Sequence, residues 1–456
     1  MVAAVLSIFP VIRTWWRSVL SRPGPAVFLM LALAVTLIGT GERADVSAIQ
    51  YGAPDAYRVV RAALTGSLFL VACMGIITDV SRVRLAGRGA QWMVAFAFMA
   101  MASAIYSVDA FISLWKGFEV MTLVLVAVSL AGQLRTAEDL NWLMNVACLL
   151  LFYIILTVYV GLALYPGEAI KDVEYLGVRG LVPLLNPASV GSISALLVVC
   201  AIGNLIHRWP SKRETAGIWV VFLAAVGTLI LAHARTPIFS AAFAIMFMLI
   251  AGRHYRFAVW AGLAGTGLIF AISIDDMLEY LYRGQTQEAF VGLTGRMNYW
   301  ENLLWPKINS SPFLGYGYYA AQRAILGTSS VDNAYLEVLI GLGFLGLSVF
   351  LIPVFLALKG LMRTRPRSGM PIVNKFLWAQ IMGIFAIIVI RALTGAAFQV
   401  QHPVLVFYML SQIGVAALLR LQSEKKPAQA AARKDMHEKP ALYRKGQSRV
   451  MPNRSR

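Results

Sequence analysis

Residues 331–355 read VDNAYLEVLIGLGFLGLSVFLIPVF, a polar start followed by an almost uncharged apolar run. An apolar run of about 17–25 residues is long enough to cross the hydrocarbon core of a bilayer as an α-helix. Similar runs recur along the chain, and the segment just before this one, residues 275–332, is the longest polar interruption between them. The stretch therefore predicts a transmembrane helix that begins directly after a large polar loop.

The composition extends this interpretation to nearly the whole chain. Of the 456 residues, 59% are hydrophobic and 14% are charged, whereas soluble domains contain roughly 25% charged residues. The sequence therefore predicts an all-α, polytopic transmembrane helical bundle over residues 1–421, with about 12 spans and a basic, disordered tail at 422–456. The predicted spans cover residues 25–40, 59–78, 90–106, 110–132, 140–164, 188–206, 216–233, 237–251, 257–274, 333–358, 376–394 and 403–420.

The positive charge indicates how the bundle is oriented. The formal net charge is +18, but 28 of the 40 Lys and Arg residues lie at the two termini and in alternate short loops. Loops rich in Lys and Arg stay in the cytoplasm, so both termini are predicted to be cytoplasmic. This charge pattern is a topology signal, and we expect no nucleic acid partner. The large loop at 275–332 then lies on the outer side of the membrane, and its apolar spacing predicts short helices within it.

Four arginines stand out because they lie on the predicted outer side, in loops or near span ends, where the positive-inside rule disfavours them. A cation beside hydrocarbon is costly and is usually kept for a partner or a function. The planar guanidinium group matches phosphate oxygens in a bidentate manner, so several arginines on one face are suited to bind a diphosphate. The alternative for each is an ion pair with a local carboxylate or a contact with lipid headgroups. These residues are Arg179, Arg235, Arg296 and Arg391.

Other polar residues on the predicted outer side suggest catalytic or binding roles. Asp332 is a candidate general base, although its position equally suits the N-cap of the helix that follows. His233 and His402 lie at outer span ends and offer imidazole groups, with an interfacial structural role as the alternative. Trp300 and Tyr316 are candidates to stack on sugar rings, or to belong to the aromatic belt at the membrane interface. No metal-ligand or nucleotide-binding spacing is present in the sequence, so we expect no metal and no cofactor.

Several short motifs, in order along residues 185–350, resemble the O-antigen ligase and polymerase family of polysaccharide-assembly membrane proteins. In that family a short turn with Arg-Thr is followed by Gly-Arg, a tryptophan, Pro with Gly-x-Gly, and then His-Asn or Asp-Asn before an apolar span with glycines. The matching segments here are Ala234-Arg235-Thr236-Pro237, Gly295-Arg296, Trp300, Ser311-Pro312, Gly315-Tyr316-Gly317, Asp332-Asn333 and Gly341-Leu342-Gly343.

The resemblance implies a membrane enzyme that transfers a glycan from undecaprenyl diphosphate to an acceptor glycan, without a metal and with inversion at the anomeric carbon. It implies that Arg235 and Arg296 hold the diphosphate and that Asn333 lies in the substrate site. It also implies the inner membrane of a bacterium, and other polysaccharide-assembly proteins as partners. Where many ligases have His-Asn, this chain has Asp332-Asn333, which favours a polymerase of lipid-linked repeat units over a ligase.

Three alternatives remain open at this stage. Ligation of a finished chain to lipid A core or to another acceptor is the alternative within the family. A secondary transporter or lipid flippase also fits twelve spans with both termini inside, although we find no inverted repeat and the polar candidates gather on one side of the membrane. A structural subunit of an export complex is the third alternative.

Overall fold

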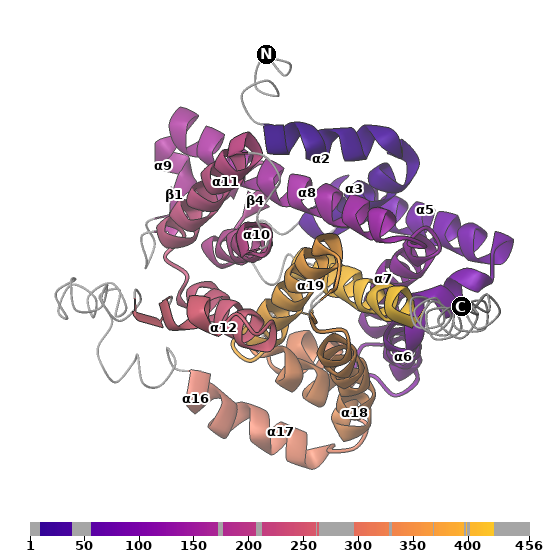
Figure 1. The fold of residues 1–456 in the computed structure, drawn as a ribbon. Coiled ribbons are helices and arrows are strands. Elements are labelled where there is room, and N and C mark those ends of the chain that lie inside the picture. The colour runs from indigo at the N-terminus through magenta and orange to yellow at the C-terminus, as the bar shows by residue number, and fades with distance from the viewer. Residues whose placement is uncertain are drawn as a thin grey trace, which may run out of the picture.

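A computed structural model describes residues 10–38, 56–171, 177–206, 212–260, 262–263, 296–327, 331–367, 369–395, 398 and 402–423. Helices account for most of these residues and pack side by side into one bundle (Figure 1). The long helices are α5 (Ala56–Thr78), α6 (Ser81–Ala102), α7 (Ala110–Ala131), α8 (Ala137–Leu164), α10 (Pro187–Ile206), α11 (Lys212–Leu231), α12 (Arg235–Ala251), α18 (Ala334–Arg363), α19 (Ile372–Arg391) and the C-terminal helix Val404–Ser423.

The apolar helices confirm a helical membrane protein. Within the described residues, seven helices are long and apolar enough to cross a membrane, or up to eight if one bent pair counts as a span. The helices α11 and α12 are also apolar but shorter than these seven, over Thr215–Leu231 and Arg235–Ala251. The predicted span at 257–274 falls mostly outside the described residues. The total of about 12 spans and the cytoplasmic termini therefore stay predictions.

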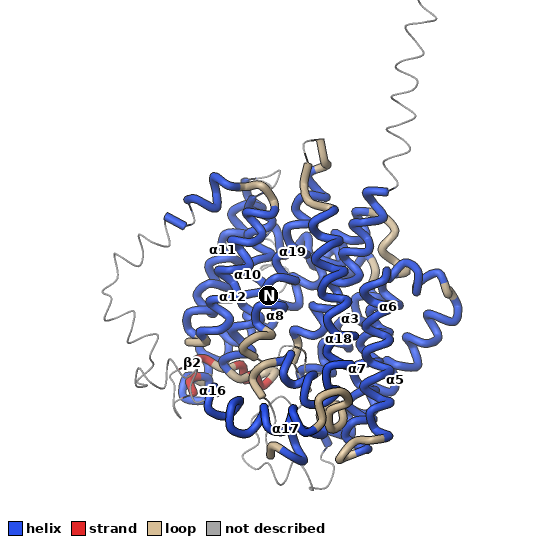
Figure 2. Tube along the Cα trace, turned by 90° about the horizontal axis from the view of Figure 1, so that it is seen from below, coloured by secondary structure: helices blue, strands red, loops and turns tan. Residues whose placement is uncertain are grey.

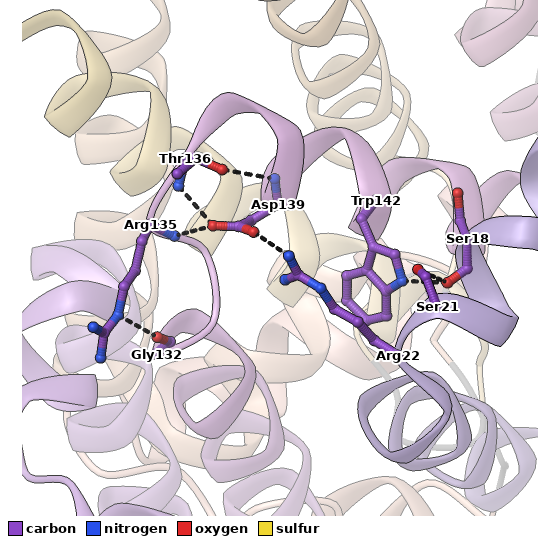
Figure 3. Close-up of polar contacts among 8 residues, drawn as sticks. All are labelled: Ser18, Ser21, Arg22, Gly132, Arg135, Thr136, Asp139 and Trp142. Carbon is purple, nitrogen blue, oxygen red and sulfur yellow. Dashed lines mark hydrogen bonds and ion pairs between the residues drawn. The ribbon is translucent and has the colours of Figure 1, made fainter.

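The bent pair is formed by α2 (Pro10–Ser21) and α3 (Pro23–Leu37), which meet at an angle of 105°. Figure 3 shows how α8 holds this corner. The Arg22 guanidinium donates to the Asp139 carboxylate at 2.5 Å, and the Trp142 indole donates to the carbonyl of Ser18 at 2.6 Å. Asp139 also completes a capping box with Thr136 at the start of α8. One carboxylate thus both caps α8 and fixes the corner.

Burial separates central helices from peripheral ones. The most apolar window of α10 is 83% buried and those of α19 and the C-terminal helix are 78% buried, whereas that of α5 is only 22% buried. Leu70, Val71, Met74 and Ile77 are among the exposed apolar side chains of α5. Since an exposed apolar helix face is stable against lipid, α5 lies at the rim of the bundle and α10 at its centre.

Short elements gather at one end of the bundle, which we call the loop face; Figure 2 shows α16, α17 and β2 there. In the described parts of the predicted large loop, short helices occur as expected, including the two π-helical turns η2 and η3. The short elements of this region are α9 (Pro166–Ala169), β1 (Ile170–Lys171), β2 (Gly177–Val178), β3 (Gly180–Leu181), β4 (Leu184–Leu185), α16 (Arg296–Tyr299), η2 (Trp300–Leu304), α17 (Trp305–Ser310) and η3 (Ala321–Ile325).

The motif glycines fasten the loop to α18. Gly343 adopts a φ of +63° inside α18, and a Cβ there would lie 2.2 Å from the backbone of Phe313. The helix is therefore kinked at Gly343, where the Phe344 amide donates to the carbonyl of Pro312 at 2.7 Å. Gly317, with a φ of +99°, donates to the carbonyl of Gly341 at 2.8 Å. The turn Gly315-Tyr316-Gly317 thus serves close packing against α18 and is not a nucleotide-binding turn.

Candidate functional site

An arginine and a carboxylate that lie 36 residues apart in the sequence meet on the loop face. Arg296 is the first residue of α16, and Asp332 lies just before α18. The Nε of Arg296 donates to Oδ2 of Asp332 at 3.1 Å, and the two side chains are 34% and 45% exposed. Asp332 has a φ of +55°, a left-handed conformation that Asp tolerates better than most residues and that concentrates at functional sites. The structure thus brings together the candidate base, Asp332, and one of the two arginines that the family resemblance assigns to the diphosphate, Arg296.

Asn333, and not Asp332, caps α18. The Asn333 side-chain oxygen accepts hydrogen bonds from the amides of Tyr335 and Leu336, both at 3.0 Å. The alternative of Asp332 as N-cap is therefore wrong, because its neighbour has that role. The Asn333 amide group also donates to the carbonyl of Leu393 at 2.9 Å. This residue fixes the backbone beside Asp332 to the end of α19, and its side chain is engaged within the protein.

Arg391, the last residue of α19, is a second cation at this site. Its side chain lies inside the bundle, 4% exposed, and contacts neutral groups. The guanidinium donates to the hydroxyl of Ser192 and approaches Nε2 of His402 at 3.2 Å. Asp332 and Arg296 are its charged neighbours. Arg391 therefore adds a buried positive charge within electrostatic range of the Arg296–Asp332 pair.

His402 lies behind Arg391 and is buried. Its Nε2 lies 3.4 Å from the hydroxyl of Ser189, and its Nδ1 accepts from the Val404 amide at 3.3 Å. Burial, reinforced by the charge of Arg391, holds the pKa of His402 well below its ordinary value. The imidazole is therefore neutral near pH 7, and its Nε2 faces both the Arg391 guanidinium and the Ser189 hydroxyl.

His233 lies in the turn between α11 and α12, and Arg235 begins α12; this turn packs on the first turns of α10. A Cβ on Gly191 would lie 3.1 Å from the side chains of Ala234 and Pro237. Arg391 contacts the same part of α10, through the carbonyl of Ala188 at 3.3 Å. The start of α12 and the end of α19 thus both adjoin the N-terminal turns of α10. Arg235 is half-buried at the first position of α12 and His233 adopts a φ of +47°.

Two predicted aromatic residues hold the loop in shape. The Trp300 indole donates to the carbonyl of Val331 at 3.0 Å, which supports the backbone next to Asp332. The Tyr316 hydroxyl contacts Ser310 and donates to the carbonyl of Lys307 at 3.1 Å, so Tyr316 ties the Gly-x-Gly turn to α17. These contacts give both residues a structural role on the loop face, while their predicted sugar contacts stay predictions.

Arg179 lies in the turn between β2 and β3 and has a local partner. Its guanidinium pairs with the carboxylate of Glu168 at 3.2 Å and also donates to the carbonyl of that residue. This is the local ion pair that the sequence left open as the alternative to a diphosphate contact.

Sequence reasoning missed the partners that α10 contributes. Ser192 contacts Arg391 and Ser189 contacts His402, across 199 and 213 residues of sequence. Polar serines at the start of an apolar span were the available signal. In the described parts of the chain, no group of three or more His, Cys, Asp and Glu side chains is placed to hold a metal ion. The chemistry of the described site is thus that of arginines, one carboxylate and one imidazole, which suits the binding of a phosphorylated ligand.

Comparison with known proteins gives one family match, in the central part of the chain. The family model described as O-antigen ligase matches residues 219–351. The match contains Arg235, Arg296 and Asp332, whereas Arg391 and His402 lie beyond it. No curated protein matches the chain. The match supports a membrane enzyme that transfers glycosyl groups, with lipid-linked glycans as the class of substrate, and it agrees with the family resemblance of the motifs in the same part of the chain.

Proposed function

We propose that this protein polymerises oligosaccharide repeat units carried on undecaprenyl diphosphate into an exopolysaccharide or O-antigen chain. The observation that carries the proposal is the Arg296–Asp332 pair, at 3.1 Å, with Arg391 as a charged neighbour. A cation and a carboxylate placed side by side match the two demands of glycosyl transfer from a diphosphate. One group must stabilise the leaving group and the other must accept a proton.

In the proposed reaction, the bond between the anomeric carbon and the diphosphate oxygen breaks as the acceptor hydroxyl oxygen attacks the same carbon. The bonding electrons leave with the diphosphate, so negative charge grows on its oxygens. Arg296 binds these oxygens, and Arg235 and Arg391 add positive charge from the neighbouring ends of α12 and α19. Since the donor is already activated, the stabilisation of this charge and the orientation of the acceptor supply most of the catalysis.

Asp332 is the proposed general base. When the diphosphate occupies the donors of Arg296, the carboxylate is released from its pairing and accepts the proton of the attacking hydroxyl. Attack from the face opposite the leaving group inverts the anomeric carbon. The left-handed backbone at Asp332, supported by Asn333 on one side and by Trp300 on the other, keeps the carboxylate in position.

Ligation of a finished glycan to a lipid or other acceptor is the second candidate, because the matching family model is described as O-antigen ligase. The chemistry at the anomeric carbon is the same in both reactions. The two functions differ in the acceptor, which is a second lipid-linked glycan in polymerisation and a different molecule in ligation.

The proposal places the site at the outer face of the bacterial inner membrane and is tested with purified protein in nanodiscs. A single lipid-linked repeat unit is the substrate, and the products are analysed by gel and mass spectrometry. A polymerase yields a ladder of longer lipid-linked chains without any added acceptor. The variant Arg296→Gln abolishes the ladder, whereas Lys307→Gln, which removes an exposed charge from α17, leaves it intact. Product that forms only when another acceptor is added would assign ligation instead.

A further inference from the structure

A second group of charges lies buried near the loop face, between α5, α7 and the loop that precedes α18. Glu119 on α7 is 1% exposed and lies between two cations. Its carboxylate contacts Lys116 Nζ at 2.7 Å and Arg61 Nη2 at 3.0 Å. Both cations are 7% exposed. Arg323 of η3 is a charged neighbour of Lys116. We call Arg61, Lys116, Glu119 and Arg323 the second cationic cluster.

The loop places an aromatic ring in this cluster. Lys116 Nζ and Arg323 Cζ each lie 5.4 Å from the centre of the Tyr319 ring, within the range of cation–π contacts. The neighbouring Tyr318 is held on α7, since its carbonyl accepts from the Ser113 hydroxyl at 3.0 Å. Tyr319 itself adopts a φ of +65°. The backbone is thus held in an uncommon conformation where the ring meets the two cations.

Positive charge is in excess here. Three cations face Glu119 and Glu337, the second carboxylate near Tyr319, and Glu337 already accepts from the Val331 amide at 3.0 Å. Among the residues that the structure describes, Arg61 has a buried Nε without a hydrogen-bond partner, while its Nη2 has the ion-pair contact with Glu119. Burying a cation without its full set of partners is costly, so the cluster is incomplete as it stands. An anion that accepts from Arg61 would complete it.

The depth and surroundings of the cluster indicate how such an anion arrives. Arg61 lies five residues after the start of α5 and Lys116 six residues after the start of α7, so both lie about 8–9 Å below the helix ends. The helix α5 packs on α7 (Figure 1) and exposes its apolar face to lipid. A lipid phosphate approaching within the bilayer would meet the cluster at the boundary between headgroups and chains.

We propose that the second cationic cluster binds the diphosphate of a second membrane-anchored lipid, namely the carrier of the acceptor glycan. Arg61 and Lys116 donate to the phosphate oxygens, while Arg323 and the Tyr319 ring close the site from the loop. This inference rests on the proposed function, because a polymerase must hold two lipid-linked chains at once. The donor diphosphate then belongs to Arg296 and the acceptor diphosphate to this cluster.

Native mass spectrometry with undecaprenyl diphosphate as the probe tests the proposal by counting lipids bound to the purified protein. We expect two bound probes in wild type and one in Lys116→Met, which leaves Arg61 and Glu119 as a balanced buried pair. Arg323→Gln, a change at a half-buried position, is a second variant that guards against misfolding of the first. Each lost charge-assisted contact weakens the second binding event by about tenfold or more. Lys307→Gln is the matched control and keeps both probes.

The outcomes separate this inference from the proposed function. Loss of one probe in Lys116→Met and of the other in Arg296→Gln supports two distinct diphosphate sites. If Lys116→Met and Arg323→Gln both still bind two probes, or if wild type binds only one, the second site is refuted. If phosphatidylglycerol displaces the second probe at equal concentration, the cluster binds any lipid phosphate and its assignment to the acceptor is refuted. Two probes retained in Arg296→Gln and one in Lys116→Met would refute the donor assignment alone.

Discussion

The substitution Asp332→Asn separates the catalytic from the structural role of this carboxylate. Asn has the same size as Asp and also tolerates the left-handed φ of +55°. The pair with Arg296 is partly exposed on both sides, and exposed ion pairs contribute about 0.2–1 kcal/mol to stability. Asn333 still caps α18. We therefore expect the free energy of unfolding to fall by about 1 kcal/mol or less.

Activity should fall much further than stability. General base catalysis contributes about 10²–10⁴-fold to a rate, which corresponds to about 2.7–5.4 kcal/mol in activation free energy. The initial rate of chain extension in nanodiscs should therefore fall by at least about a hundredfold in Asp332→Asn. SDS-titration unfolding of the same preparation checks that the fold persists. A variant with normal stability and a rate within a few-fold of wild type would show that Asp332 is not the base.

Three further predictions concern the framework around the site. Asn333→Ala removes both the α18 cap and an interhelical hydrogen bond, and should lower the free energy of unfolding in SDS titration by about 1–3 kcal/mol. Gly343→Ala places a Cβ against the backbone of Phe313 at a positive φ, which costs roughly 3 kcal/mol or more, so the yield of monodisperse protein on size exclusion should collapse. The depressed pKa of His402 means that unfolding takes up a proton, so stability is present above the unfolded value of about 6.5 and is lost as the pH falls below it. Thermal midpoints from pH 8 to 5 should show this decline, with a weaker slope in His402→Gln, whereas equal slopes would show that His402 does not contribute.

The helical membrane fold could be predicted from hydropathy because a chain in lipid must satisfy its own backbone hydrogen bonds, and helices do so within one segment. The stretch 333–358 illustrates this, since α18 begins at Ala334 as the polar-to-apolar boundary indicated. The contact between Arg296 and Asp332 could also have been suspected from the sequence. Both residues occupy motifs within one predicted loop, and Asp332 lies directly before the apolar span that ends this loop.

The partners of buried charges could not be predicted, because they depend on which helices become neighbours. The sequence placed Arg391 near a span end, but its contact with Ser192 joins α19 to α10. Lys116 and Glu119 are three residues apart on one helix, so their pairing was visible in principle. The approach of Arg61 from α5 and of Arg323 from the loop was not. The sequence also could not show that Asn333 caps α18, because Asp332 adopts a left-handed φ of +55° just before it.

The short segment from Val331 to Glu337 lies between the two proposed cationic centres, which are the Arg296–Asp332 site and the second cationic cluster. Asp332 pairs with Arg296 on one side, while Glu337 is a charged neighbour of Tyr319 in the second cationic cluster. The Val331 amide donates to Glu337 and its carbonyl accepts from Trp300, so the segment is held from both directions. If each centre holds one diphosphate, as proposed, this segment borders both bound carriers. The attacking hydroxyl and the anomeric carbon then meet beside Asp332, because it is the carboxylate of this segment that borders the donor arginines.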